Sequence, residues 1–183
     1  MGGGSLLALY NGLVLPHLQY CLMVWADFQG CRNKVLGDAL LRYQKQFARL
    51  AAGRRGLHHS DPLFAQLGML KVGDLYRQQL RVHAWRFWRG MLPANQAAML
   101  GRVGDVHGHA TRAAGSGLFV STRDHRAVGY RVPVEWGSLS EAQRGVPSLA
   151  AFRRGLRASF LGGYGASVCR ERGCLVCAGG WVG

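Results

Sequence analysis

The chain has 183 residues, enough for one domain with a hydrophobic core or for two small helical modules. Lysine and arginine total 23 against 9 acidic residues, a net charge of +14, and most of the basic residues are arginine. Arginine suits phosphate oxygens, so the composition favours a polyanionic partner, with a solvated arginine-rich surface as the alternative. Five cysteines do not indicate a secreted disulfide framework, and we expect an intracellular protein, nuclear or cytoplasmic.

The segment Leu6–Ala26 carries no lysine, arginine, aspartate or glutamate and is about long enough to cross a bilayer. Pro16, His17 and Gln19 oppose a membrane span, and the features of a signal peptide are missing. We therefore expect no membrane association. Ser5 is a candidate cap for a first helix, and Pro16 predicts that the segment forms two short buried helices.

A helix is predicted from the cap Asn33 to about Ala52, where Gly53 is placed to end it. At about 100° per residue its apolar and basic residues fall on nearly opposite arcs. The predicted core face is Leu36, Leu40, Tyr43, Phe47 and Leu50, and the predicted basic face is Arg42, Lys45 and Arg49. A further helix is predicted to start with Asp61 as its cap and Pro62 at its first position.

The longest predicted helix runs from Lys71 to Met91 and ends before Pro93. Its apolar side is Val72, Tyr76, Leu80, Ala84, Phe87 and Met91, and its other side is Arg77, Arg81, Trp85, Arg86, Trp88 and Arg89. Exposed tryptophans beside arginines would stack on the bases of a nucleic acid. The alternative is a second buried face of a helix that is packed on two sides. That face would consist of Leu75, Val82, Trp85 and Trp88.

Residues Gly101–Ser121 are rich in glycine, histidine and serine and are predicted to be a loop between two modules. Val128–Trp136 is predicted as a short strand that turns at Pro133 into a helical turn. Ser148 is a candidate cap for a last helix. This helix combines the apolar stripe Leu149, Phe152, Leu156 and Phe160 with Arg153, Arg154 and Arg157. The chain after Leu161 is rich in glycine and is predicted to be disordered.

Metal and catalytic chemistry have weak support in the sequence. Cys169, Cys174 and Cys177 contain the C-x2-C part of a zinc knuckle, but a fourth ligand is missing. We therefore expect no metal and no cofactor. Nucleotidyl transfer needs carboxylates grouped around two metal ions, whereas the nine carboxylates here are far apart in sequence. We expect no catalytic residues and no enzyme activity.

Four short motifs follow one another along the chain. They are the run LYNGLVLPHLQYCLMVW from Leu9 to Trp25, then Asp61-Pro62-Leu63-Phe64, His109-Ala110-Thr111-Arg112 and Pro133-Val134-Glu135-Trp136. This ordered set resembles the region after the palm in reverse transcriptases of non-LTR retrotransposons of the jockey and LINE type. The resemblance covers about residues 6–161. Val132 stands where that family usually has glycine, and Gly137 and Ser140 replace its usual asparagine and proline, so the chain resembles a decayed or truncated copy.

The resemblance implies a non-catalytic fragment that lacks the polymerase palm and holds the template-primer duplex by its backbone. It also implies a mainly α fold: a helical thumb-like bundle over residues 1–100, a small, mostly helical C-terminal module with a short strand or hairpin over 101–161, and a tail over 162–183. The partner would be RNA or an RNA–DNA or DNA duplex, with no small-molecule substrate. The alternatives are a protein-interaction module or a relic without a selected function.

The predicted contacts to nucleic acid come from every basic segment described above. They are Arg42, Lys45, Arg49, Arg54, Arg55, Arg77, Arg81, Trp85, Trp88, Arg89, Arg112, Arg131, Arg153 and Arg157. Contacts to a phosphate backbone would make the binding sensitive to salt and tolerant of sequence.

Overall fold

The computed structural model describes residues 3–26, 34–54, 59–106, 117–120 and 127–165. These residues form a mainly α fold without a β-sheet, and one isolated antiparallel bridge joins Arg102 to Leu118. The predicted helical class is thus confirmed. The elements are α1 (Gly3–Leu9), the π-helical turn η1 (Tyr10–Val14), α2 (Leu15–Gln19), α3 (Leu22–Trp25), α4 (Lys34–Ala51), α5 (Asp61–Gln66), α6 (Val72–Trp88), α7 (Ala94–Ala97), α8 (Val103–Val106), α9 (Val128–Gly137), α10 (Glu141–Arg144) and α11 (Leu149–Gly165).

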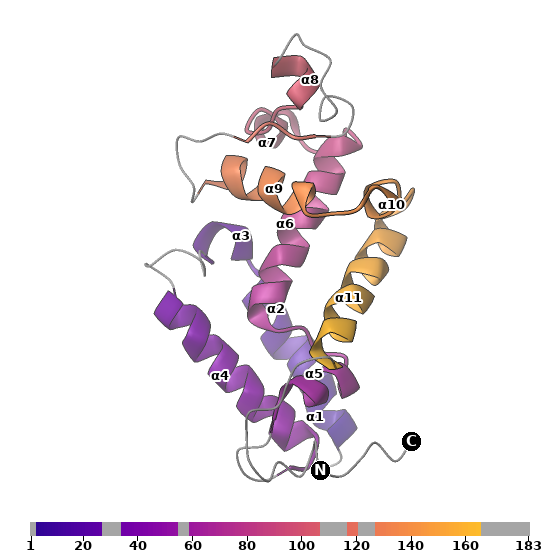
Figure 1. Cartoon of the computed structure of the whole chain (residues 1–183). Helices are drawn as coiled ribbons and strands as arrows, with labels where there is room; N and C mark the ends of the chain where they lie inside the picture. The colour runs from indigo at the N-terminus through magenta and orange to yellow at the C-terminus, as the bar shows by residue number, and fades with distance from the viewer. Residues whose placement is uncertain (1–2, 27–33, 55–58, 107–116, 121–126, 166–183) are drawn as a thin grey trace.

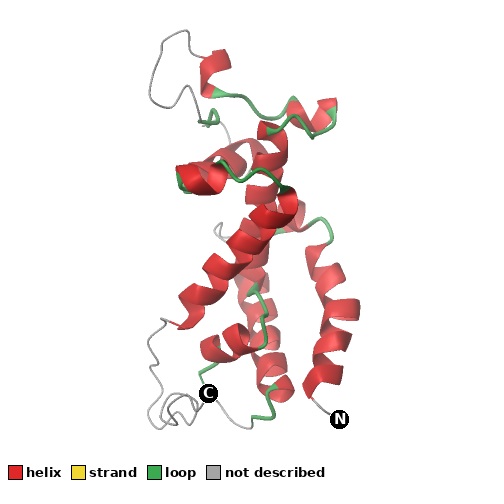
Figure 2. Ribbon diagram, turned by 90° about the vertical axis from the view of Figure 1, so that its right-hand side faces the viewer, coloured by secondary structure: helices red, strands yellow, loops and turns green. Residues whose placement is uncertain are grey.

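The long helix α6 is the axis around which the other elements are arranged (Figure 1). Helices α4 and α11 lie on opposite sides of α6, and α9 crosses it near its C-terminal end. The far end of α11 packs on α5. In the view turned by 90°, α11 slants across the front of the molecule and the helix that begins at the N-terminus stands at its edge (Figure 2).

Helices α4, α5 and α6 end in the same way, at a glycine with positive φ. Gly53, Gly68 and Gly90 have φ angles of 64°, 62° and 67°. At α4 the N–H of Arg54 donates to the carbonyl of Arg49 at 2.8 Å, and the N–H of Gly53 donates to Leu50 at 3.0 Å. This Schellman pattern satisfies carbonyls of the last turn and needs a left-handed residue, which glycine adopts without strain.

The predicted end of α4 at Gly53 is therefore confirmed. The predicted end of α6 is too late, because the same pattern at Gly90 ends that helix at Trp88 rather than Met91. Asp61 lies within the first turn of α5 and Ser60 takes the cap position, so the predicted start is one residue late. The predicted cap Asn33 lies outside the described residues.

The N-terminal segment is one helix over Gly3–Gln19 with a π-helical turn just before Pro16, and the short helix α3 follows after a break at Cys21. Proline cannot donate a hydrogen bond and collides with the preceding turn, and the widened turn η1 accommodates it. Tyr10 is buried, whereas most side chains of this helix are exposed, so the predicted burial is wrong. Among the described residues no helix has the length and apolar character that crossing a bilayer requires.

Helix α4 turns a different side toward the core than its sequence predicts. The buried residues are Gly37, Gln44, Ala48 and Ala51. The predicted core residues Leu36, Tyr43 and Leu50 are 44%, 68% and 62% exposed. The prediction fails for these three residues, whereas Leu40 and Phe47 of the predicted core face do pack against the core. The fully buried positions hold small residues and Gln44, which a hydropathy pattern does not mark.

Helix α6 is packed on several sides. Of its predicted apolar side, Val72, Tyr76, Leu80 and Ala84 are buried, whereas Met91 lies beyond the helix and is exposed. The second face is buried as well, since Leu75, Val82 and Trp85 all belong to the core. This outcome matches the alternative interpretation of α6 for these three residues.

The predicted strand at residues 128–136 is wrong, because α9 is a helix with Pro133 in its interior. Val132, Pro133 and Trp136 are buried, and α9 packs on α6. The spacing of four between Val128, Val132 and Trp136 places them on one helical face. Tertiary packing outweighs the strand preference of the β-branched residues.

Helix α11 begins as predicted, with the Ser148 hydroxyl accepting a hydrogen bond from the N–H of Ala151 at 3.2 Å. Phe152 and Leu156 are buried, and the helix continues to Gly165. Residues 162–165 are therefore helical, contrary to the predicted disorder, and the rest of the tail lies outside the described residues. One hydrophobic core joins Trp85 of α6 to residues of both α9 and α11.

Candidate nucleic-acid interface

The predicted stacking platform on α6 is not available to a base at Trp85. Its side chain is 1% exposed and stacks on Phe152 with ring centroids 5.9 Å apart. Its indole N–H donates to the carbonyl of Val146 at 3.1 Å. Trp85 is therefore a core residue that fastens α11 and the segment before it to α6, and its predicted contact with bases is wrong.

Trp88 is half-buried, and its ring already has neighbours. The ring of Trp136 lies 5.9 Å away, and the guanidinium of Arg102 lies 4.6 Å from the Trp88 centroid. Arg102 also donates to the Trp88 carbonyl at 3.0 Å. The cation–π position over an indole is thus occupied within the chain. A base could stack there only after Arg102 moved away.

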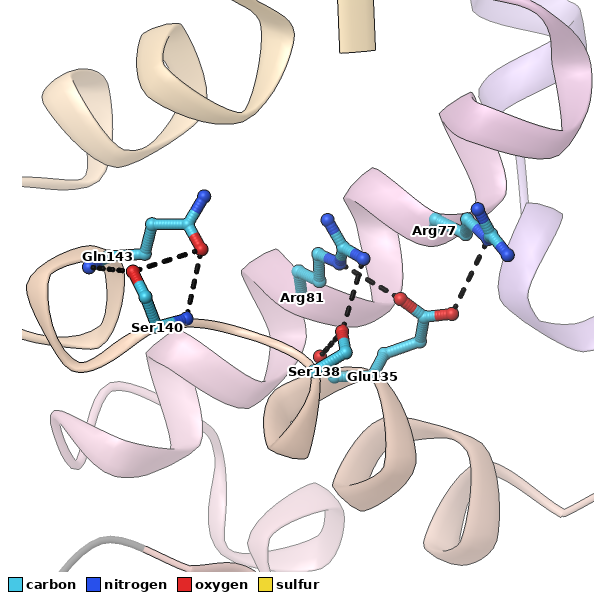
Figure 3. A network of polar contacts seen from close by, with 6 residues as sticks. All are labelled: Arg77, Arg81, Glu135, Ser138, Ser140 and Gln143. Atoms are coloured by element: carbon cyan, nitrogen blue, oxygen red, sulfur yellow. Dashed lines mark hydrogen bonds and ion pairs between the residues drawn. The ribbon is translucent and has the colours of Figure 1, made fainter. Parts of the chain in front are cut away.

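Two arginines of α6 bind one carboxylate on α9. Glu135 accepts from Nε of Arg81 at 2.9 Å, and its other oxygen lies 3.5 Å from Nε of Arg77 (Figure 3). Arg81 also donates to the Ser138 hydroxyl at 3.1 Å. Figure 3 further shows the capping box in which Ser140 and Gln143 start α10. These arginines therefore join α6 to α9, and Arg77 remains partly exposed.

Arg89 is likewise used within the chain. It is exposed, yet its guanidinium donates to the carbonyls of Gly145 and Val146 at 3.3 and 3.1 Å. It also lies 5.5 Å from the centroid of Trp85. Arg131 lies half-buried on α9. The predicted contact residues Arg77, Arg81 and Arg89 of α6 thus bind partners within the chain.

The best surface for a polyanion is a groove between α6 and α11, which we call the arginine groove. Its volume is about 320 Å³. It is lined by Gln19, Gln78, Gln79, Val82, Arg153, Arg154 and Arg157. All three arginines are exposed. Only two of them, Arg153 and Arg157, belong to the contacts predicted from the sequence.

The geometry of α11 explains why these arginines gather there. Phe152 and Leu156 are buried against the core, so the positions that follow them point outward along one edge of the helix. Arg157 also donates to the carbonyl of Gly68, which anchors one wall of the groove to the end of α5.

The electrostatics of the arginine groove favour an anion. Its described lining contains three guanidinium groups, three amides and no carboxylate. The nearest acidic groups of α6 and α9 have partners: Asp74 accepts from the Tyr164 hydroxyl and Glu135 binds Arg81. Burial raises the pKa of the Tyr164 hydroxyl, and its hydrogen bond to Asp74 adds to this effect, so the tyrosine stays a neutral donor.

Arg154 and the three glutamines are the residues of the groove that the predicted site did not include. Gln79 donates to the backbone carbonyl of Gln19 at 2.9 Å and so ties α6 to the end of α2. Gln78 and Gln79 follow Arg77 on α6, where the predicted contacts are arginines and tryptophans. Knowing that α6 and α11 are neighbours would have been necessary to find them.

The basic residues of α4 and of the turn that follows it form a separate surface. Arg42 and Arg54 are exposed, and Lys45 and Arg49 are partly exposed. Helix α4 lies on the other side of α6 from α11, so these side chains do not join the arginine groove (Figure 1). The predicted contacts Arg55 and Arg112 lie outside the described residues.

The structure gives no basis for a metal centre within the described residues, where no three histidine, cysteine or acidic side chains come together. The candidate ligands Cys169, Cys174 and Cys177 lie outside that part of the chain. Comparison with known proteins gives no match, whether with a family model, a curated protein or a solved structure.

Proposed function

We propose that the chain binds nucleic acid through the arginine groove, without catalysis and without strong preference for sequence. The observation that carries this proposal is the position of Arg153, Arg154 and Arg157 beside three glutamines in a groove without a carboxylate. Arginine forks bind phosphate oxygens with two parallel hydrogen bonds, and amide groups add neutral donors. RNA, DNA and RNA–DNA duplexes all offer such oxygens.

The packing of the tryptophans favours backbone contacts over contacts to bases. Trp85 is buried and Trp88 is covered by Arg102, so neither tryptophan of α6 presents a free face beside the arginines of that helix. Contacts to phosphates position a protein on its partner but do not distinguish base sequences. We therefore expect affinity to depend on salt much more than on sequence.

We further propose that the chain derives from the region after the palm of a non-LTR retrotransposon reverse transcriptase. The order of the four sequence motifs supports this origin. A thumb-like fragment would grip a duplex in the cell without joining nucleotides, in agreement with a non-catalytic arginine groove. Its location would be intracellular.

The test compares two triple variants with the same loss of charge. One replaces the groove arginines (Arg153→Gln, Arg154→Gln, Arg157→Gln), and the other, the α4 variant, replaces basic residues of α4 and of the turn that follows it (Arg42→Gln, Lys45→Gln, Arg54→Gln). Affinity for a labelled RNA–DNA duplex of about 20 base pairs is measured by fluorescence anisotropy at several salt concentrations. Because each phosphate contact contributes a slope of about 0.9 in log affinity against log salt, the groove variant should lose a slope of about 2 to 3. The α4 variant should lose much less.

Arg157 also contacts Gly68, so the double variant of Arg153 and Arg154 serves as a control with that contact intact. It should lose a slope of about 2 while keeping the thermal stability of the parent chain. Equal losses in the groove and α4 variants would contradict the proposal, because they would indicate a diffuse charge effect. Unchanged binding in both would contradict it as well.

A further inference from the structure

An exposed tyrosine stands at the end of the arginine groove. Tyr20 directly follows Gln19, which lines the groove at the end of α2. The side chain of Tyr20 is 76% exposed, and none of the aromatic or cation–π contacts within the described residues involves its ring. An open aromatic face beside a basic groove is a surface on which a base can stack.

The turn of α2 places Tyr20 on the outer rim of the arginine groove. Leu18 faces α4, because it lines a separate pocket together with Leu40 and Phe47. Gln19, one residue later, faces α6 and α11. Each residue of an α-helix is turned by about 100° from the residue before it. The next step in the same direction carries Tyr20 past Gln19 toward solvent, so that its ring lies outside the groove lining and next to it.

The backbone that carries this ring is held on both sides. The N–H of Tyr20 donates to the carbonyl of Pro16 at 3.0 Å, and its carbonyl accepts from the indole N–H of Trp25 at 2.7 Å. Cys21, with a φ of 49°, then turns the chain into α3, which packs on α6. A tyrosine side chain has only two torsions to fix, so a ring on a fixed backbone loses little entropy when it is covered by a ligand.

The groove and the tyrosine match the two parts of a nucleotide. The guanidinium groups of the groove suit phosphate oxygens, and the ring suits the flat face of a base. Bases inside a duplex are paired and stacked on one another, whereas unpaired bases can be splayed out and stacked on aromatic side chains. Every base has such a face, so this contact is tolerant of sequence. The combination therefore selects a strand with unpaired bases.

We propose that the arginine groove binds an unpaired segment of nucleic acid, with phosphates against Arg153 and Arg154 and a base stacked on Tyr20. The inference rests on the proposed function of the groove and adds to it the structural class of the ligand, a single strand. Single strands of RNA and DNA share the chemistry that this site recognises. Tyr20 is absent from the contacts that the sequence predicts.

The experiment uses the full chain and three labelled ligands. They are a single strand of about 12 thymidines, an abasic strand with the same number of phosphates, and the RNA–DNA duplex described above. Fluorescence anisotropy at low salt measures the affinity for each. The thymidine strand should bind about five-fold or more tightly than the abasic strand, because only the former can stack.

Two substitutions of exposed tyrosines separate stacking at the groove from general loss of aromatic surface. Tyr20→Ala should weaken the thymidine strand by about five-fold or more and leave the abasic strand and the duplex unchanged. Tyr43→Ala, at a 68% exposed position of α4, is the matched control and should change none of the three affinities. Tyr20→Phe keeps the ring and should bind the thymidine strand like the parent chain.

Two results with Tyr20→Ala would overturn the proposal. The first is an affinity for the thymidine strand equal to that of Tyr43→Ala, which would mean that no base stacks on this ring. The second is equal weakening of the thymidine and abasic strands, which would mean that the substitution disturbs the groove itself.

The Arg153 and Arg154 double variant separates these failures from failure of the proposed function. If it weakens all three ligands while Tyr20→Ala weakens none, the groove binds phosphates and only the assignment of Tyr20 is wrong. If the double variant weakens none of them, the proposed function and the assignment of Tyr20 are both wrong.

Discussion

The two sides of α6 are built differently although both are helical. On the side of α9 and α11, large side chains fill the interface, and Trp85, Trp136 and Phe152 are almost fully buried. On the side of α4, the fully buried residues of that helix are small apart from Gln44, Leu40 and Phe47 are only partly buried, and Tyr43 and Leu50 are exposed. A helix can thus be fixed either by bulky interlocking side chains or by close approach of its backbone.

The α4 side compensates for its small interface with a buried hydrogen-bond network. Gln44 donates to the Tyr10 hydroxyl at 2.8 Å and to the carbonyl of Leu70 at 3.2 Å, and it accepts from the N–H of Val72 at 2.7 Å. The last bond satisfies a donor of the first turn of α6, which a helix cannot satisfy itself. Burial raises the pKa of the Tyr10 hydroxyl and keeps it neutral. One glutamine therefore joins four segments.

The largest expected effect tests the packed side. Trp85→Ala removes a buried ring together with its contact to Phe152 and its hydrogen bond to Val146, and should lower the free energy of unfolding by about 3 to 5 kcal/mol. Tyr43→Ala removes an exposed ring and should change it by less than about 0.5 kcal/mol. Chemical denaturation followed by circular dichroism measures both. Similar losses in the two variants would refute the contrast between the sides of α6.

The next effect tests the network on the α4 side. Gln44→Ala leaves buried groups of Tyr10, Leu70 and Val72 without their partner, and each such group costs about 1 to 3 kcal/mol when it stays dry. Partial entry of water should reduce the total to about 2 to 4 kcal/mol. Gln46→Ala on the exposed side of α4 is the matched control and should stay within about 0.5 kcal/mol.

A loss below about 1 kcal/mol for Gln44→Ala would mean that the apolar contacts of α4 fix this helix without the network. In that case amide exchange at Val72 should still be slow in the variant. Fast exchange at Val72 with an unchanged free energy of unfolding would instead show that the start of α6 opens independently of the core.

The third prediction links the packed side to the proposed binding. Glu135→Gln removes the negative charge that holds Arg77 and Arg81, and the partly exposed pairs should cost about 1 to 2 kcal/mol in the free energy of unfolding. The released arginines should also increase duplex affinity a few-fold at low salt. Glu141→Gln on α10 removes one carboxylate that forms no ion pair with the described residues of α6, and so isolates the effect of net charge. An equal increase in duplex affinity in both variants would show that Arg77 and Arg81 do not contribute to binding.

Much of the helical architecture follows from local sequence. Gly53 predicts the end of α4 and Ser148 predicts the start of α11, because caps depend on one or two residues and their own backbone. The predicted strand at residues 128–136 is wrong because Val128, Val132 and Trp136 are four residues apart. This spacing fits both the period of a strand and the period of a helix. Only the contact with α6 decides between the two. The prediction of the buried side of α4 also fails because it depends on tertiary contacts. The fully buried residues of α4 are mostly small, and a hydropathy pattern does not mark them.

Some residues of the candidate site are predictable from local sequence, and others depend on tertiary packing. Arg153 and Arg157 are predictable from the stripe on α11, whereas Gln19, Gln78 and Gln79 join them only through the packing of three helices. For Trp85 the error is the opposite one, a predicted contact that the structure does not allow. Its position between arginines in the sequence is typical of a stacking platform, but its side chain is buried in the core. Composition indicates the kind of partner, and tertiary contacts decide which side chains reach it.

The smallest predicted effect concerns pH and the half-buried His83 of α6. Burial lowers the pKa of His83 below its usual 6.5, and the positive charge of Arg86 lowers it further. The unfolded chain therefore binds more protons than the folded chain below about pH 6.5, so His83 makes the folded state less stable as the pH falls through this range. We expect wild type to lose more free energy of unfolding between about pH 7.5 and about pH 5.5 than His83→Gln, whose side chain does not titrate. All other titrating groups are shared, so the difference between the two denaturation series isolates His83, and identical series would mean that its imidazole is as well hydrated in the folded chain as in the unfolded one.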